Sequence, residues 1–144
     1  MTASSNDVDS VVAINNELYD AFEAGDLDRM EALWIDGDLA DAAICVHPGW
    51  APLRGRSAIL RSWAVIMANT SYIQFFLTDV DVRVSGDVAV VTCTENILTP
   101  GPSDAEAVFG GSRAVSTNVF RRTSTGWRMW VHHASPVITP DVSS

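Results

Sequence analysis

The stretch FEAGDLDRMEALW, residues 22–34, predicts two helices joined by a tight turn. Before and within it, apolar side chains recur every three or four positions over residues 7–24, which is the spacing of an amphipathic helix. Gly25 can end that helix in a left-handed conformation, and Asp26 can cap the helix that follows. We therefore expect the fold to begin with a helical hairpin.

Downstream of the hairpin, a short apolar run at residues 42–47 and a loop at Pro48 precede a third helix with one apolar face, which starts after Gly55. Beyond residue 71 the pattern changes to strands, because β-branched and aromatic residues dominate and short hairpin-type connections separate the runs. The four runs are SYIQFFLTDVDVRV, DVAVVTCTENIL, AVFGGSRAVSTNVFRR and GWRMWVHHASPV.

This order predicts an α+β domain in which about three N-terminal helices pack on a curved antiparallel sheet. Gly110 and Gly111 suggest a β-bulge within the third run. A chain of 144 residues suffices for one domain, which we place at residues 8–137, with flexible termini at 1–7 and 138–144.

Composition restricts the function classes. A net charge of −9 disfavours nucleic acid and anionic membranes as partners, since both reward a basic surface. No apolar run is long enough to span a bilayer, and the N-terminal stretch lacks the pattern of a signal peptide, so we expect a cytoplasmic protein. Cys45 and Cys93 stand in apolar surroundings and are expected to be buried free thiols.

The segments FEAGDLDRMEALW, HPGW, LRGRSAI and GWRMWVHHASP resemble the SnoaL-like branch of the nuclear-transport-factor-2-like superfamily over about residues 8–137. This resemblance implies a cone-shaped fold with a pocket between the helices and the concave side of the sheet. It also implies a homodimer formed through the outer sheet faces. Function is less defined, because the superfamily includes isomerases, cyclases, dehydratases and members that only bind ligands or partners.

Two of the three histidines are adjacent, at His132 and His133 in the last run. Strand alternation sends neighbouring side chains to opposite faces, so they cannot act as a pair. His133 shares its face with Trp127 and Met129, which predicts that it faces the pocket, while His132 is expected on the outer face. A core histidine satisfied by a neighbouring acceptor is the alternative for His133.

His47 is the other candidate for proton transfer, since an imidazole titrates near neutrality. It resembles the general base of ketosteroid isomerases in position, where those enzymes have an aspartate before a proline. The isomerase tyrosine of the first helix aligns with Leu18, one step from Tyr19. Polyketide cyclases of the SnoaL branch carry an aspartate on the last strand, and no carboxylate stands there in this chain. A loop histidine packed beside Pro48 is the alternative for His47.

Glu95 and Asn118 are polar residues on strands whose alternating neighbours are apolar, so both are expected to project into the pocket. A buried carboxylate needs a partner, and we expect His133 or Arg113 to supply it for Glu95. The alternative places Glu95 on the outer face, against an arginine across a dimer interface.

Five tryptophans are many for this length, and an aromatic-walled pocket suits a small, flat, apolar ligand. The candidate ligand-binding residues are Trp34, Trp50, Trp63, Asn118 and Tyr19. No cofactor and no metal are expected, because the sequence has no phosphate-binding loop, dinucleotide motif, HExxH motif or cysteine cluster.

Together these features predict a pocket for a small apolar carbonyl compound, of polyketide or steroid type, with cofactor-free acid/base catalysis. His47 and His133 would move protons, Glu95 or Asn118 would orient them, and isomerisation, cyclisation or dehydration would be the reaction. The alternative is a non-catalytic module for ligand binding or dimerisation, in which these polar groups only satisfy one another.

Overall fold

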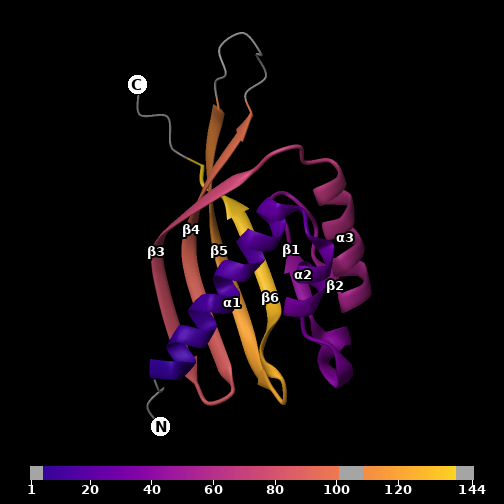
Figure 1. Ribbon diagram of the computed structural model, residues 1–144, viewed down its shortest axis with the longest axis vertical. Coiled ribbons are helices and arrows are strands. Elements are labelled where there is room, and N and C mark those ends of the chain that lie inside the picture. Colours follow the sequence, from indigo (N-terminus) through magenta and orange to yellow (C-terminus); the bar gives the residue numbers. More distant parts are fainter. Residues whose placement is uncertain (1–4, 101–108, 139–144) are drawn as a thin grey trace.

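The computed structural model describes residues 5–100 and 109–138 and contains helices packed on one side of a strongly curved sheet (Figure 1). The helices are α1 (Ser5–Ala24), α2 (Leu27–Leu33), a short 3-10 helix (Gly37–Ala42) and α3 (Arg56–Ala68). The strands are β1 (Ile44–Val46), β2 (Leu53–Arg54), β3 (Gln74–Ser85), β4 (Val88–Pro100), β5 (Phe109–Thr123) and β6 (Gly126–Pro136). The predicted α+β class is confirmed.

The helical hairpin forms where the sequence predicts it. Gly25 adopts a left-handed φ of 63°, and the Asp26 side chain accepts a hydrogen bond of 3.1 Å from the Arg29 amide at the start of α2. Helix α1 begins at Ser5, so the helix starts before the domain boundary expected at residue 8, and the Asp7 carboxylate pairs with Arg122 at 2.8 Å.

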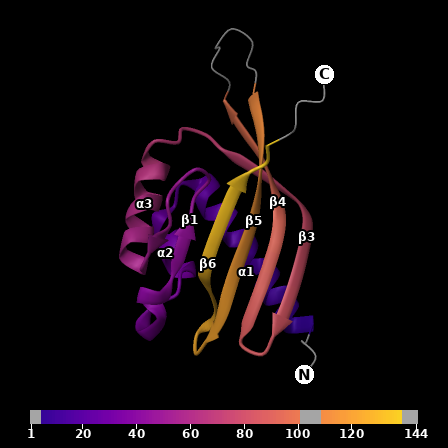
Figure 2. The same cartoon turned by 180° about the vertical axis from the view of Figure 1, so that it is seen from behind.

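The sheet has the strand order β2-β1-β6-β5-β4-β3. Strands β3 to β6 form the predicted antiparallel meander, and β1 adds to it in parallel with β6, so the sheet as a whole is mixed. Helix α1 crosses the concave face of the meander, and the reverse view shows the opposite sheet face without a helix over it in the part of the chain described (Figure 2).

Two β-bulges shape the described part of the sheet, and neither lies at the predicted glycines. Gly110 and Gly111 pair continuously with β4, whereas the register shifts between Thr78 and Asp81 in β3 and opposite Val119 and Phe120 in β6. The bulge predicted in the third run is therefore wrong.

The bulge in β6 leaves Trp130 as an extra residue, because Val119 pairs with Val131 while the next residue, Phe120, pairs with Met129. The bulge lies where the backbone segment that pairs with the outer edge of β6 changes. The Met129 carbonyl accepts a bond from the Ile35 amide, and β1 begins its pairing at Val131. Because of this extra residue, each β6 side chain after the bulge points to the sheet face opposite to the one that simple alternation predicts.

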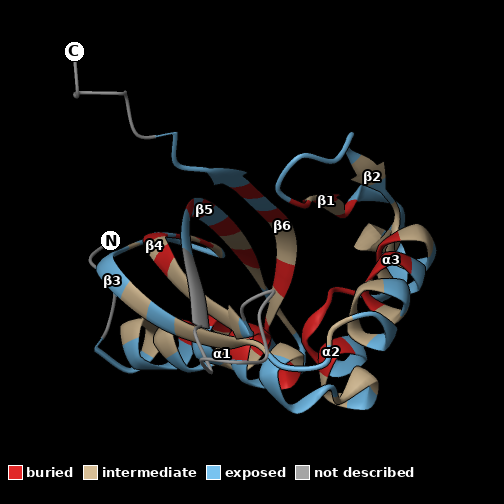
Figure 3. Ribbon diagram, turned by 90° about the horizontal axis from the view of Figure 1, so that it is seen from above, coloured by how far each residue is buried: buried red, intermediate tan, exposed pale blue. Residues whose placement is uncertain are grey.

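The core lies between α1, α2, α3 and the concave face, where the buried residues gather in the view from above (Figure 3). Trp34 belongs to this core with 1% of its surface exposed, as do Leu18, Met30 and Phe120. None of the helices in the described ranges is both long and apolar enough to cross a membrane.

Candidate active site

A cavity of about 270 Å³ opens between α1, α3 and the concave face of the sheet. Its walls are mainly apolar, with aromatic and aliphatic side chains. The aromatic residues that line it are Tyr19, Phe22, Trp50, Trp63 and Phe75. Three further polar side chains reach it from separate elements, namely His47 after β1, Glu95 on β4 and His132 on β6. The fold thus collects its titratable groups from positions far apart in the chain.

His132, rather than His133, faces this cavity. His132 is 3% exposed and lines the cavity, whereas His133 is exposed on the outer face of the sheet. The predicted facing of the two histidines is therefore wrong, and the cause is the bulge at Trp130. Trp127 and Met129 before the bulge share the inner face with His132 after it.

The two cavity histidines lie close together. The ring centroids of His47 and His132 are 6.4 Å apart, and His47 makes T-shaped contacts with Trp63 and Trp50 at centroid distances of 4.7 and 5.0 Å. Both imidazoles are buried, and burial disfavours the charged form. It lowers the pKa of His47 to about 4. Burial, followed by repulsion from His47 and His133, lowers the pKa of His132 to about 3.

Each imidazole also has a hydrogen-bond partner. The Nε2 atom of His47 lies 2.8 Å from the Ser62 hydroxyl of α3, and the Nδ1 atom of His132 lies 2.6 Å from the amide oxygen of Asn118. Asn118 is fully buried behind His132 and donates to the Asn15 side chain at 2.8 Å. Asn118 thus orients a cavity residue and lies outside the cavity lining.

Glu95 is 4% exposed and lies on the inner face, and its partner is neither His133 nor Arg113. The Tyr19 hydroxyl donates a 2.6 Å hydrogen bond to its Oε2 atom. Burial raises the pKa of Glu95, and the hydrogen bonds from Tyr19 and Ser116 oppose that rise. Burial, and then the nearby Glu95, raise the pKa of the Tyr19 phenol.

Of the three tryptophans predicted to bind the ligand, two line the cavity and one does not. Trp63 forms a wall of the cavity, and Trp50 stands at its rim with 43% of its surface exposed. Trp34 is a core residue outside the lining, which corrects its predicted role. Sequence reasoning missed Ser62, although a hydroxyl between the apolar residues of a helix face was a signal that could have found it.

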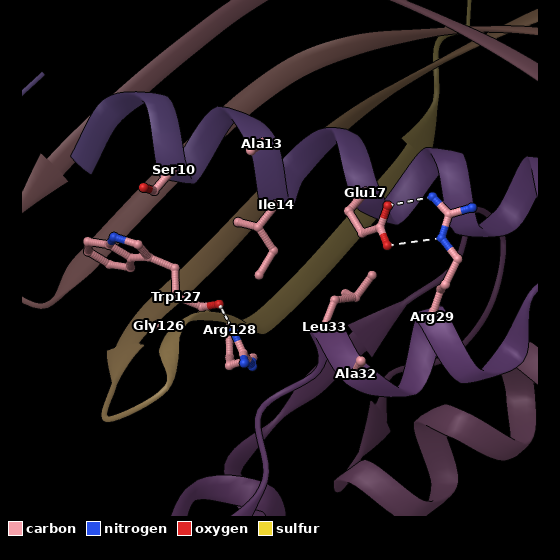
Figure 4. A pocket seen from close by; sticks show the side chains of 10 residues that line it. All are labelled: Ser10, Ala13, Ile14, Glu17, Arg29, Ala32, Leu33, Gly126, Trp127 and Arg128. Atoms are coloured by element: carbon pink, nitrogen blue, oxygen red, sulfur yellow. Dashed lines mark hydrogen bonds and ion pairs between the residues drawn. The ribbon is translucent and has the colours of Figure 1, made fainter. Parts of the chain in front are cut away.

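A larger depression of about 580 Å³ lies elsewhere, between α1, α2 and the turn that joins β5 to β6 (Figure 4). Its charged groups are already engaged. Arg29 forms two hydrogen bonds to Glu17, at 2.6 and 3.0 Å, and Arg128 donates to the Trp127 carbonyl at 2.8 Å. The aromatic cavity, with its buried titratable groups, is therefore the better candidate for chemistry.

In the described residues, no group of three or more histidine, cysteine or acidic side chains is placed to hold a metal ion. Cys45 approaches His47, with its sulfur 3.6 Å from Nε2, but both cysteines are buried free thiols. Burial raises the pKa of the Cys45 thiol, which keeps it protonated and unreactive.

Comparison with known families identifies the fold. The family model of the SnoaL-like domain matches residues 11–139. The chain belongs to this family. An experimental structure from Streptomyces avermitilis, a candidate dehydratase of the NTF2-like family, is 51% identical, covers 95% of this chain and all of that one, and has a TM-score of 0.87.

Other similar proteins have diverse names. A candidate association domain of a calcium/calmodulin-dependent protein kinase type II from Thiobacillus denitrificans is 32% identical over 88% of this chain and 94% of that one, with a TM-score of 0.75. The F-box protein SKIP8 of Arabidopsis thaliana is 24% identical over 92% of this chain. The chain spans about half, 52%, of the length of that curated relative. The family thus fixes the fold and leaves the reaction open.

Proposed function

We propose that this SnoaL-like protein binds a small carbonyl-bearing ring compound and catalyses cofactor-free proton transfer on it. The observation that carries this proposal is the meeting of two neutral imidazoles with a tyrosine–glutamate pair in one aromatic cavity. Isomerisation and cyclisation need the same groups. Dehydration is the reaction to test first, because the 51% identical relative from Streptomyces avermitilis is a candidate dehydratase.

In a dehydration, His132 would accept the proton from the carbon next to the carbonyl through its Nε2 atom. The electron pair of that C–H bond forms the new C=C bond, and the C–O bond to the β-hydroxyl breaks. The leaving oxygen takes a proton from the imidazolium and departs as water, which returns His132 to its neutral form. Because burial lowers the pKa of His132, its imidazolium is a stronger acid than an ordinary one, which favours the second proton transfer.

Asn118 supports this role by holding the Nδ1 proton of His132, which leaves Nε2 free to accept. His47 stands on the same side of the cavity as a second proton carrier, held by Ser62. The carbonyl of the substrate would need an N–H or O–H donor. The indole N–H of Trp63 fits this requirement, since it is buried without a hydrogen-bond partner in the described part of the chain.

The test is a turnover assay with β-hydroxy ketones built on one or two rings, in which the conjugated product is followed by its ultraviolet absorbance. His132→Asn keeps a donor near the Nδ1 position and removes the basic Nε2, so we expect it to abolish turnover. His133→Asn, on the outer face, is the matched control and should keep full activity. Equal turnover by the wild type and His132→Asn would refute this mechanism.

Ligand binding without catalysis is the second candidate function, and one observation favours it. Both imidazoles have strongly lowered pKa values and are weak bases, whereas an efficient general base has a pKa near the working pH. A compound that binds the cavity tightly and is recovered unchanged, in place of turnover by any member of the ketone series, would support this function.

We also propose that two copies of the chain associate through the outer sheet face. Phe76 and Val115 expose 53% and 46% of their surfaces there. Exposed apolar side chains that gather on one face are typical of interaction sites. The 32% identical relative named as an association domain is consistent with such a use of this fold.

A further inference from the structure

Which groups donate and which accept in the hydrogen bonds around the cavity follows from the ionised Glu95 carboxylate. An ionised carboxylate can only accept hydrogen bonds, so the Tyr19 hydroxyl must give its single proton to Oε2, across 2.6 Å. The Tyr19 oxygen can then only accept from its other neighbours. The Asn118 side chain, 3.3 Å away, therefore presents its N–H group to that oxygen.

This orientation of Asn118 decides which nitrogen of His132 carries the proton. With its nitrogen bonded to Tyr19 and Asn15, Asn118 turns its carbonyl oxygen toward the Nδ1 atom of His132, at 2.6 Å. An amide oxygen only accepts, so Nδ1 is protonated. A neutral imidazole has only one N–H group, so the Nε2 atom of His132 carries an unshared electron pair and can accept a hydrogen bond.

The N–H group of His47 is committed in a similar way. The Ser62 hydroxyl has one proton and donates it to the Ile59 carbonyl at 2.6 Å. The Nε2 atom of His47, 2.8 Å from the same hydroxyl oxygen, must therefore be the donor in that contact. Neither histidine retains an N–H group for a ligand.

With Glu95 ionised, the cavity consequently offers hydrogen-bond acceptors and one negative charge. Among the described residues that line the cavity, Glu95 is the only acidic or basic residue apart from the two histidines, and none is an arginine or lysine. The indole N–H groups of Trp50 and Trp63 are donors, but they are uncharged, and Trp50 stands at the exposed rim. An anionic ligand would meet the Glu95 carboxylate without a compensating cation, which is costly in a buried site.

We infer that the cavity binds a compound of one or two rings through hydroxyl or ammonium groups that donate to Glu95 and His132, and that it rejects carboxylates. This inference rests on the proposed small-molecule function and specifies its ligand class. A volume of about 270 Å³ lies just below the range typical of drug-sized ligands, and the aromatic walls suit a flat ring system.

The inference can be tested with four naphthalene probes that share one ring system and differ in their polar groups. They are 2,7-dihydroxynaphthalene, 2,7-dimethoxynaphthalene, 2-naphthylmethylamine and 2-naphthoate, each titrated into the whole protein and followed by calorimetry. We expect the diol or the amine to bind at least roughly tenfold more tightly than the dimethoxy compound and the carboxylate. Which of the two binds better tells whether hydroxyl or ammonium is the preferred donor.

Glu95→Gln supplies a variant arm, because glutamine keeps the shape, removes the charge and adds an N–H donor. It should reduce the preference for amine or diol over naphthoate by roughly tenfold, while Glu31→Gln, at an exposed position of α2, leaves it unchanged. Tighter or equal binding of naphthoate or the dimethoxy compound by the wild type overturns the inference, as does the absence of binding by all four probes. Turnover in the ketone assay would in either case leave the proposed function standing.

Discussion

The two buried histidines predict that the free energy of unfolding falls at acidic pH, because their protonation is linked to folding. In the unfolded chain a histidine takes up a proton near its ordinary pKa of 6.5. In the folded state His47 and His132 resist protonation down to about pH 4 and about pH 3. The unfolded state therefore binds more protons across this interval, and the free energy of unfolding falls as the pH falls below 6.5.

The size of the effect follows from the pKa values. Between pH 7 and pH 5, each histidine lowers the free energy of unfolding by ~2 kcal/mol, or ~4 kcal/mol for the two together. Glu95 acts in the opposite direction, because its pKa is raised in the folded state and protonation favours folding. Since small domains are stable by only about 5–15 kcal/mol, the loss is a large fraction of the total.

The assay is urea denaturation at pH 7 and pH 5, followed by tryptophan fluorescence. His47→Gln keeps a donor toward Ser62 and His132→Asn keeps one toward Asn118, so each variant should reduce the loss between the two pH values by ~2 kcal/mol relative to the wild type. His133→Asn should retain the wild-type loss. Because Glu95 contributes equally to the wild type and the variants, the difference between them isolates the histidines, and variants with the same loss as the wild type would refute the reasoning.

Three further predictions follow from the described contacts. Tyr19→Phe should lower the free energy of unfolding by about 1–3 kcal/mol at pH 7, and by less in acid, because Glu95 loses its donor; urea denaturation at both pH values measures it. Trp34→Phe should cost about 1–2 kcal/mol in the same assay and leave the calorimetric affinity for the naphthalene diol unchanged, as expected of a core residue. Val115→Asp should convert a dimer to a monomer in sedimentation equilibrium, while Val65→Asp, at an exposed position of α3, should not; a wild-type monomer would contradict the proposed interface.

The helical hairpin was predictable because its signals are local. Gly25 and Asp26 end one helix and cap the next through interactions within a few residues, and such chemistry can be recognised in the sequence. That the Glu95 side chain points to the inner sheet face was predictable for a related reason. No bulge interrupts the pairing of β4 with β5 between Ala89 and Glu95, so simple alternation holds there. Local rules suffice where the strand is regular.

The facing of His132 and His133 was not predictable in this way. The bulge at Trp130 arises where β6 changes partners, from Ile35 to β1, and this change depends on segments about 90 residues away in the chain. The partner of Glu95 was missed for the same reason, because Tyr19 reaches it from a helix 76 positions earlier. Asn15 appears in the sequence as one polar residue on an apolar helix face, and only the fold places it against Asn118.

The polar groups of the cavity are costly to keep, and this cost itself argues for ligand binding over core packing. The neutral histidines destabilise the fold in acid, whereas the buried Glu95 carboxylate destabilises it toward neutral pH, where its ionised form is desolvated. Apolar residues of similar size would fill the same space without either cost. Sites where the fold accepts such a cost are typically functional, and here the costly groups converge on one aromatic-walled opening instead of being dispersed through the core.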